Sequence, residues 1–166
     1  MPEDTGPTLH LLCGKVASGK STLAQSLASR PRSVLLSEDA WLSGLFSEDL
    51  RSHADYVRLS TRLRQTIAPH IIDLLRSGTS VVLDFQANTG ESRRWMRGLI
   101  DEAGCRHQLH YLDVSDDVCK QRLSLRNASG KHEFSVTEAE FDRISAHFHA
   151  PSEKEGFNLK IHNAAD

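Results

Sequence analysis

The sequence predicts an α/β fold, in which a parallel sheet carries helices on both of its faces. Short apolar segments alternate with helical segments from residue 8 onward, and this alternation is typical of parallel strands joined by crossover helices. The segment Thr79–Asp84 is an almost continuous apolar run, as expected of a strand that is buried on both faces. The length of 166 residues suits a single domain with one hydrophobic core.

Five strands are expected, and the first of them should lie in the middle of the sheet. Their ranges are Thr8–Cys13, Ser33–Ser37, Thr79–Asp84, Arg106–Val114 and Phe157–His162. Helices should follow at Ser21–Ser29, His53–Ser77, Thr89–Gly104, Ser115 through Leu125, and Thr137 through Phe148, the last with Phe141, Ile144 and Phe148 inward. Pro69 should kink the helix from His53 or split it in two, and Gly78 should close it.

Residues Gly14–Ser21, GKVASGKS, match the phosphate-binding pattern G-x-x-x-x-G-K-[ST]. A glycine-containing turn that happens to hold a lysine is the alternative. The expected strand before the loop and helix after it favour phosphate binding, because backbone N–H groups and the helix dipole then point at the same anion. The predicted nucleotide-binding residues are Gly14, Lys15, Ala17, Ser18, Gly19, Lys20, Ser21 and Thr22.

Within this loop, Lys20 should reach the β- and γ-phosphates of ATP, and the Ser21 hydroxyl should bind Mg²⁺. Asp84 ends the third strand and is placed to hold Mg²⁺ through its water shell, to support Asp39, or to line the substrate site. ATP and Mg²⁺ are therefore the predicted cofactors. The sequence does not distinguish ATP from GTP.

Two carboxylates, Glu38 and Asp39, follow the second strand at the edge where ligands bind in open α/β sheets. Asp39 is the candidate general base, which would take the proton of a substrate hydroxyl. The alternative is a helix N-cap whose acids complement the helix dipole, and this interpretation is favoured for Glu38.

Three arginine pairs raise the possibility of anion binding. Arg93 and Arg94 lie near a helix start, where the dipole would favour acids, so they are candidates for substrate contact, with a surface pair as the alternative. Arg58 and Arg62 lie one turn apart and are more simply explained as a solvated face. Arg122 and Arg126 precede a polar stretch between two helices, a pattern typical of a lid over ATP at about residues 122–138.

Composition limits the other possibilities. The net charge is −2, from 20 basic and 22 acidic residues, so no overall charge attracts nucleic acid or an anionic membrane. Cys13, Cys105 and Cys119 lack metal-site spacing and are interpreted as reduced thiols. No apolar stretch approaches the length of about 20 residues that a membrane helix needs, and residues 1–7 are too polar for a signal peptide. A cytoplasmic location is expected.

The sequence resembles the small P-loop kinases that include zeta toxins, chloramphenicol phosphotransferase and the kinase domain of polynucleotide kinase. The resemblance covers roughly Thr8 to Ile161 and rests on GKVASGKST, SEDAW, VVLDFQANTGESRRW and YLDVSDDVCKQRLSLRN. It implies a three-layer P-loop NTPase fold with strand order 2-3-1-4-5, Lys20 and Ser21 at phosphate and Mg²⁺, and Asp39 as base. It also implies that the lid arginines Arg122 and Arg126 clamp the transferring phosphate.

One departure from these relatives concerns the acceptor. Polynucleotide kinases place an arginine shortly after the aspartate and aromatic residue, whereas Leu42 follows Trp41 here. A nucleic-acid partner is therefore less expected than a small hydroxyl compound, with Trp41, Arg93 and Arg94 as walls of its pocket.

The expected activity is ATP- and Mg²⁺-dependent transfer of the γ-phosphate to a small-molecule hydroxyl, with Lys20, Asp39 and Arg126 as catalytic residues. The alternatives are a 5′-hydroxyl nucleic-acid kinase, a nucleotide-hydrolysing switch that acts on a protein partner, and an inactive nucleotide-binding module. Both a monomer and a homodimer fit the sequence.

Overall fold

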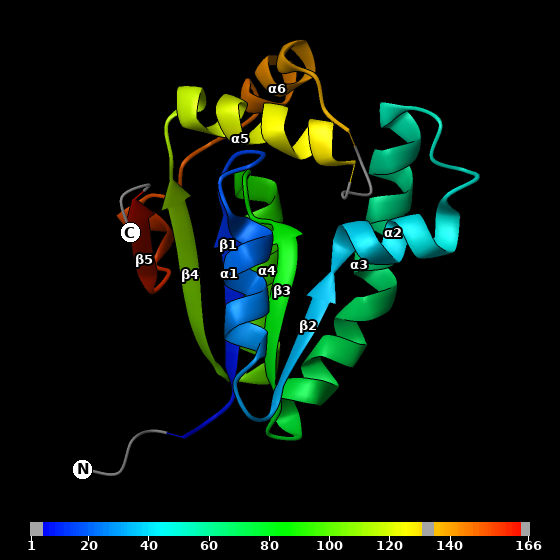
Figure 1. The fold of residues 1–166 in the computed structure, drawn as a ribbon. Helices are drawn as coiled ribbons and strands as arrows, with labels where there is room; N and C mark the ends of the chain where they lie inside the picture. The colour runs from blue at the N-terminus through cyan, green and yellow to red at the C-terminus, as the bar shows by residue number, and fades with distance from the viewer. Residues whose placement is uncertain (1–4, 131–134, 164–166) are drawn as a thin grey trace.

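The computed structural model describes residues 5–130 and 135–163, which contain a parallel five-stranded sheet. The sheet order is β2-β3-β1-β4-β5. The strands are β1 (Thr8–Cys13), β2 (Ser33–Ser37), β3 (Ser80–Gln86), β4 (Arg106–Asp113) and β5 (Leu159–Asn163). All neighbouring strands run parallel, so their carboxyl ends meet at one edge, which is the upper edge in Figure 1. The predicted fold class, strand order and central first strand are confirmed.

Helices cover both faces of the sheet (Figure 1). The helices are α1 (Lys20–Ala28), α2 (Glu38–Phe46), α3 (His53–Arg76), α4 (Gly90–Ala103), α5 (Asp116–Ser129) and α6 (Glu138–Ser145), with a short 3₁₀ helix η1 (Glu153–Glu155). Strand residues alternate between the faces: Leu9 and Leu11 pack in the large core with α3 and α4, whereas Leu12 packs with Ala24 and Leu27 of α1. The central strand β1 is thus covered on both sides, which places the loop after it over the middle of the sheet.

Helices α5 and α6 lie above the carboxyl edge of the sheet (Figure 1). Cys119 and Leu123 of α5 and Phe141 of α6 form a small buried cluster of their own. Val16 and Ala17, from the loop after β1, pack against this cluster. The two helices therefore contact the phosphate-binding loop directly.

Three local expectations differ from the structure. Of the kink and the split that were the alternatives at Pro69, the split does not occur: the chain forms one helix there, because buried residues on both sides, Ile67 and Ile71, hold the segment in the core. The strand β3 continues to Gln86, since Phe85 is buried and stacks near Trp95 instead of starting a loop. Ile144 of α6 was expected to point inward and is 39% exposed.

The predicted helix ends are confirmed at several positions. Thr89 caps α4 by accepting the backbone N–H of Ser92 at 3.1 Å, and Thr137 caps α6 by accepting that of Glu140 at 3.2 Å. Gly78 follows α3 with a φ of +91°, the left-handed conformation that glycine adopts most readily. Thr89 thus ends the loop that follows β3 at the carboxyl edge, whereas Gly78 lies just before β3, at the opposite edge of the sheet.

Candidate active site

The loop Gly14–Gly19 leaves β1 and turns directly into α1. Gly14 has no room for a side chain, because a Cβ there would overlap the Ser18 hydroxyl. Ala17 and Gly19 both have positive φ angles, of 63° and 104°, and a non-glycine residue in this conformation stores strain of the kind found at functional sites. The loop is thus bent into a tight turn that directs it over the N-terminus of α1.

Asn88 fixes this loop to the neighbouring strand. Its side-chain oxygen accepts the Gly14 N–H at 2.9 Å, and its amide nitrogen donates to the Gly14 carbonyl at 2.8 Å. The sequence placed Asn88 only in a rim loop and gave it no role. Its position directly after a strand end, among small polar residues, is the one signal that could have identified it.

Lys20 lies at the first position of α1, with its ammonium inside the loop. It donates to the carbonyls of Gly14 at 2.5 Å and Lys15 at 2.9 Å. Burial lowers the pKa of Lys20 to about 8, although the negative charges of Asp84 and Asp39 act in the opposite direction. A cation held by two carbonyls inside a loop is well placed to turn towards a phosphate.

The Ser18 hydroxyl shows that the loop fits an anion. This oxygen is buried and has no hydrogen-bond partner among the residues that the structure describes. A buried hydroxyl without a partner costs free energy, which a phosphate oxygen at the same place would recover.

Ser21 and Asp84 form an oxygen pair beside Lys20. The Ser21 hydroxyl donates to Oδ2 of Asp84 at 3.2 Å. Hydroxyl and carboxylate oxygens are ligands that Mg²⁺ accepts, usually together with phosphate oxygens and water. Two protein ligands next to a phosphate loop therefore fit Mg²⁺, whereas no group of three or more His, Cys, Asp or Glu side chains in residues 5–130 and 135–163 could hold a metal on its own.

Asp39 and Glu38 are neighbours with different surroundings. Ser37, not an acid, caps α2 by accepting the Ala40 N–H at 3.3 Å. Glu38 is 2% exposed and accepts hydrogen bonds from Tyr56 at 2.9 Å and Arg64 at 2.9 Å. Both carboxylates line the same cleft as Lys20, but Glu38 is buried, whereas Asp39 is partly exposed. The first turn of α2 thus brings two carboxylates to the cleft, of which Glu38 is held by Tyr56 and Arg64.

The cleft has a volume of about 420 Å³ and collects residues from five segments. It is lined by Val16, Ala17, Gly19, Lys20, Ser21, Thr22, Glu38, Asp39, Asp84, Gln86, Arg122, Leu125 and Arg126. Arg122 donates to the Ser18 carbonyl at 3.1 Å, which places this α5 arginine against the loop. The structure therefore brings the proposed base, the loop lysine, the Mg²⁺ ligands and both lid arginines to one cleft.

The proposed lid, residues 122–138, includes residues outside the described ranges. In the described part, α5 ends at Ser129 and Gly130 follows it with a φ of 65°. Lys15 of the loop donates to Asp116, the first residue of α5, at 2.7 Å. This ion pair joins the N-terminal end of α5 to the phosphate loop.

Two of the cavities that share residues with the cleft also reach the phosphate loop. One, of about 670 Å³, shares Val16 and Gln86 with it and extends to His53, Phe148 and the side chains of α6. The other, of about 480 Å³, shares Gly19, Thr22 and Arg122 with it and extends to β4 and β5. A molecule in either cavity would lie next to the phosphate loop.

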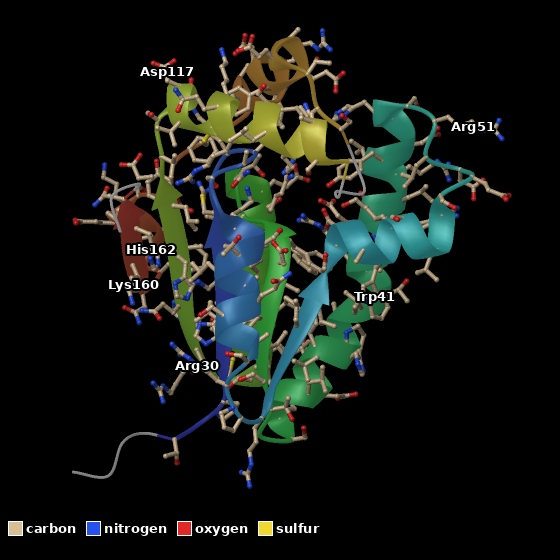
Figure 2. The ribbon with its side chains drawn as sticks, in the orientation of Figure 1. Arg30, Trp41, Arg51, Asp117, Lys160 and His162 are labelled. Atoms are coloured by element: carbon tan, nitrogen blue, oxygen red, sulfur yellow. The ribbon has the colours of Figure 1, made fainter. Side chains whose placement is uncertain are left out.

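Three residues expected in the acceptor pocket are placed differently. Arg93 is 3% exposed, and its guanidinium donates to Glu155 at 2.7 and 3.1 Å and to the carbonyls of Ala87 and His149 at 2.8 Å. Burial and these bonds make it part of the scaffold, so the structure contradicts a substrate contact. Trp41 is 40% exposed and is not among the residues that line the cleft; in Figure 2 it lies below α2, whereas the lid lies above.

Arg94, the third, is exposed on α4, and one of its nitrogens would lie 3.6 Å from a Cβ at Gly90. It is not among the residues that line the cleft or the larger cavity beside it. Arg58 and Arg62 of α3 are also exposed, and Arg58 pairs with Asp55 at 3.4 Å. A solvated face remains the simpler interpretation of these two.

The three cysteines form no metal site with other side chains in residues 5–130 and 135–163. Cys13, Cys105 and Cys119 are free thiols, and burial raises the pKa of Cys13 to about 12. Among the helices of the described ranges, none is long and apolar enough to cross a membrane.

Comparisons with known proteins agree with this geometry. A family model described as an AAA domain matches residues 9–151. No curated protein sequence matches the chain. Many solved structures do, among them a protein of Chloroflexus aurantiacus with a provisional kinase assignment. It is 24% identical, the match covers 95% of this chain and 85% of that one, and the TM-score is 0.75.

Two other solved structures share the fold. The Mycobacterium tuberculosis APS kinase, solved with AMPPNP and APS, is 21% identical over 97% of this chain and 90% of its own, with a TM-score of 0.64. The Chaetomium thermophilum protein Kti12, solved with ADP-AlF3, is 14% identical over 95% of this chain and 90% of its own, with a TM-score of 0.72. At these identities the likeness establishes the shared fold.

Proposed function

The chain belongs to the AAA-domain family, and from this membership and the site we propose that it is an ATP- and Mg²⁺-dependent phosphotransferase. It moves the γ-phosphate of ATP to a hydroxyl group of a small molecule. The observation that carries this proposal is that Asp39 lines the same cleft as Lys20 and Ser21. A carboxylate beside a phosphate loop gives the site an internal base, which a transfer to a hydroxyl requires.

The triphosphate is proposed to lie along the loop and the N-terminus of α1. The backbone N–H groups of the loop donate to phosphate oxygens, and Lys20 turns from its two carbonyl partners to the β- and γ-phosphates. Ser21 and Asp84 would hold Mg²⁺, which would neutralise part of the phosphate charge. Arg122 and Arg126 approach the same charge from the lid.

The two adjoining cavities divide the remaining tasks. The cavity beside Thr22 lies at the end of the loop from which α1 departs, and it is assigned to the nucleoside. The larger cavity beside Val16 and Gln86 is assigned to the acceptor, since about 670 Å³ is within the usual range for a small-molecule site. The Ser145 hydroxyl lines this cavity and, within residues 5–130 and 135–163, has no hydrogen-bond partner, so an acceptor group could supply one.

In the reaction, the acceptor oxygen attacks the γ-phosphorus and the bond to the bridging oxygen of ADP breaks. Asp39 accepts the proton of the acceptor hydroxyl, so that the oxygen gains charge as the new bond forms. Lys20 and Arg126 offset the charge that spreads over the transferring group and the leaving oxygen. The products are ADP and the phosphate ester, and the proton on Asp39 is later released to water.

A nucleotide-hydrolysing switch is the competing function, because it needs the same loop. It needs neither an internal base beside the γ-phosphate nor an acceptor cavity. The presence of both, in Asp39 and in the cavity along α6, supports the phosphotransferase.

The test measures ADP release from ATP and Mg²⁺ by the purified protein, with and without a panel of small hydroxyl compounds. We expect release that depends on one class of compound, with the phosphorylated product detected by mass spectrometry. Equal release in the absence of any acceptor would support the switch instead.

The variant Asp39→Asn makes the test specific to the base. It keeps the shape of the side chain, so ATP binding should be unchanged while acceptor phosphorylation falls about a hundredfold, the usual scale for a general base. Asp49→Asn, on an exposed turn just after α2, is the matched control. Unchanged turnover in Asp39→Asn would exclude Asp39 as the base, and weakened, metal-dependent ATP binding would indicate a Mg²⁺ ligand instead.

A further inference from the structure

Three histidines form a hydrogen-bonded chain across three neighbouring strands. Nδ1 of His10 on β1 lies 3.1 Å from Nε2 of His110 on β4, and Nδ1 of His110 lies 3.0 Å from Nε2 of His162 on β5. His10 and His110 are 7% and 2% exposed. Across the strand pairs His110 lies opposite Leu12 and His162 opposite Leu112, so each histidine is closer than the last to the carboxyl edge.

The two buried histidines, His10 and His110, are neutral at pH 7. Burial, then the charges of Arg30 and Arg106, lower the pKa of His10 to about 4. Burial, then the charges of His10, His162, Lys160 and Arg30, lower that of His110 to about 3. A neutral imidazole carries one N–H and one bare nitrogen, so hydrogen bonds along such a chain must all point the same way.

The surroundings of His10 select one of the two directions. His10 and both arginines line a cavity at the amino ends of the strands, and Figure 2 shows Arg30 at that end of the sheet. Cations favour a bare nitrogen on the side of His10 that they approach, and this leaves the proton on Nδ1. His10 then donates to His110, His110 donates to His162 through its own Nδ1, and His162 also carries its proton on Nδ1.

The other end of the chain reaches the site. His162 lines the 480 Å³ cavity together with Ser18, Gly19 and Thr22 of the phosphate loop and Arg122 of α5. This is the cavity assigned to the nucleoside. In Figure 2, His162 and Lys160 lie on β5, at the far side of the sheet from α2.

We propose that His162 contacts the nucleoside half of the bound nucleotide as a hydrogen-bond donor, and that His110 and His10 are positioning residues that fix its tautomer. The proposal rests on the phosphotransferase function only in that it needs nucleotide binding. The chain selects a nucleoside atom that accepts a hydrogen bond, such as a ribose oxygen or a ring nitrogen. A chain that serves only to align β1, β4 and β5 would not respond to nucleotide.

The first experiment compares a ligand that carries the nucleoside with one that lacks it. The dissociation constants of AMPPNP and of inorganic tripolyphosphate are measured, both with Mg²⁺, for the wild type and for His162→Ala. We expect AMPPNP to bind about tenfold more weakly to the variant, the scale of one hydrogen bond, and tripolyphosphate to bind equally to both. Ile161→Ala, an exposed neighbour on β5, is the matched control and should bind both ligands as the wild type does.

The outcomes separate this inference from the proposed function. If neither ligand binds to the wild type, the nucleotide site itself is wrong. If both bind and His162→Ala weakens neither, or weakens both equally, the nucleoside contact is wrong.

The second experiment tests the relay without any substitution. Imidazole nitrogen shifts of ¹⁵N-histidine-labelled protein identify which nitrogen carries the proton. We expect Nδ1–H in all three histidines and a change at His10 when AMPPNP binds, with exposed His70 of α3 as the internal reference. His110→Met, which cuts the chain, should abolish the change at His10. A wild type in which His10 carries its proton on Nε2, or does not respond to AMPPNP, would overturn the relay.

Discussion

Arg93 and Arg122 were both candidates for contact with substrate or phosphate, and the protein holds them in opposite ways. Arg93 is buried and donates to Glu155 and to the carbonyls of Ala87 and His149, so it joins the end of β3, the segment after α6 and η1. Arg122 is exposed on α5 and donates to the Ser18 carbonyl of the phosphate loop. Arg93 joins three segments inside the protein, whereas Arg122 lines the cleft beside the phosphate loop.

This difference teaches that an arginine near a site acts according to its burial and its partners. A buried guanidinium that is bonded on several sides cannot turn to a ligand without losing those bonds. An arginine at the mouth of a cleft can turn at little cost. Substitution of buried Arg93 should therefore change stability, and substitutions in the phosphate loop and the lid should change turnover.

The largest effect is expected for Lys20→Ala. Turnover should fall about a thousandfold, the scale of losing about 4 kcal/mol of transition-state stabilisation. Because burial lowers the pKa of Lys20, the charged side chain disfavours the folded state, and the variant should unfold at the same temperature or higher. Steady-state kinetics and thermal unfolding check both parts. Near-normal turnover in a folded variant would contradict the phosphate-loop assignment.

The next largest effect is a loss of stability when Arg93 is replaced. Arg93→Ala leaves Glu155 and two carbonyls without their donor, and should reduce the free energy of unfolding by about 3–5 kcal/mol. Denaturant unfolding measures this loss, and Arg94→Ala, an exposed neighbour on the same helix, is the control that should change little. If Arg93→Ala kept full stability and lost only acceptor affinity, Arg93 would be a substrate contact after all.

A smaller effect is expected in the lid. Arg126→Ala should lower kcat about tenfold or more while the KM for ATP changes less, because charge on the phosphate spreads most in the transition state. Its stability should stay close to that of the wild type. Arg62→Ala, on the exposed face of α3, is the control for losing one positive charge. An unchanged kcat would place Arg126 among the solvated arginines.

Stability should also depend on acid pH. The folded pKa values of His10 and His110 lie below the ordinary value of 6.5, at about 4 and about 3. Between these values and 6.5 the unfolded chain binds more protons, so stability is full above pH 6.5 and declines as the pH falls through this window. Thermal unfolding from pH 7.5 to 4.5 should show the decline, and it should be shallower in a variant that carries His110→Met. Equal pH dependence of stability in the wild type and in His110→Met would mean that other groups cause the decline.

The sequence by itself determined the fold class and the approximate positions of the strands and of α1, α3, α4, α5 and α6, but it did not predict α2. The five strands, the strand order implied by the family resemblance and the helix caps at Thr89, Ser115 and Thr137 follow from patterns that involve residues close together in the chain. The phosphate loop was identifiable for the same reason, since its glycines and Lys20 have fixed spacing. The meeting of Asp39 and Asp84 with that loop was predictable because parallel strands end at one edge.

Only the tertiary structure decided which polar side chains line the cleft and which are hydrogen-bonded to other parts of the protein. Arg93 and Glu155, Glu38 and Arg64, and Asn88 and Gly14 are paired over long sequence separations. No local pattern distinguishes these residues from Arg126 or Asp39. The physical reason is that burial and hydrogen bonding depend on which segments pack against one another, and that is set by the whole core rather than by neighbours in the sequence.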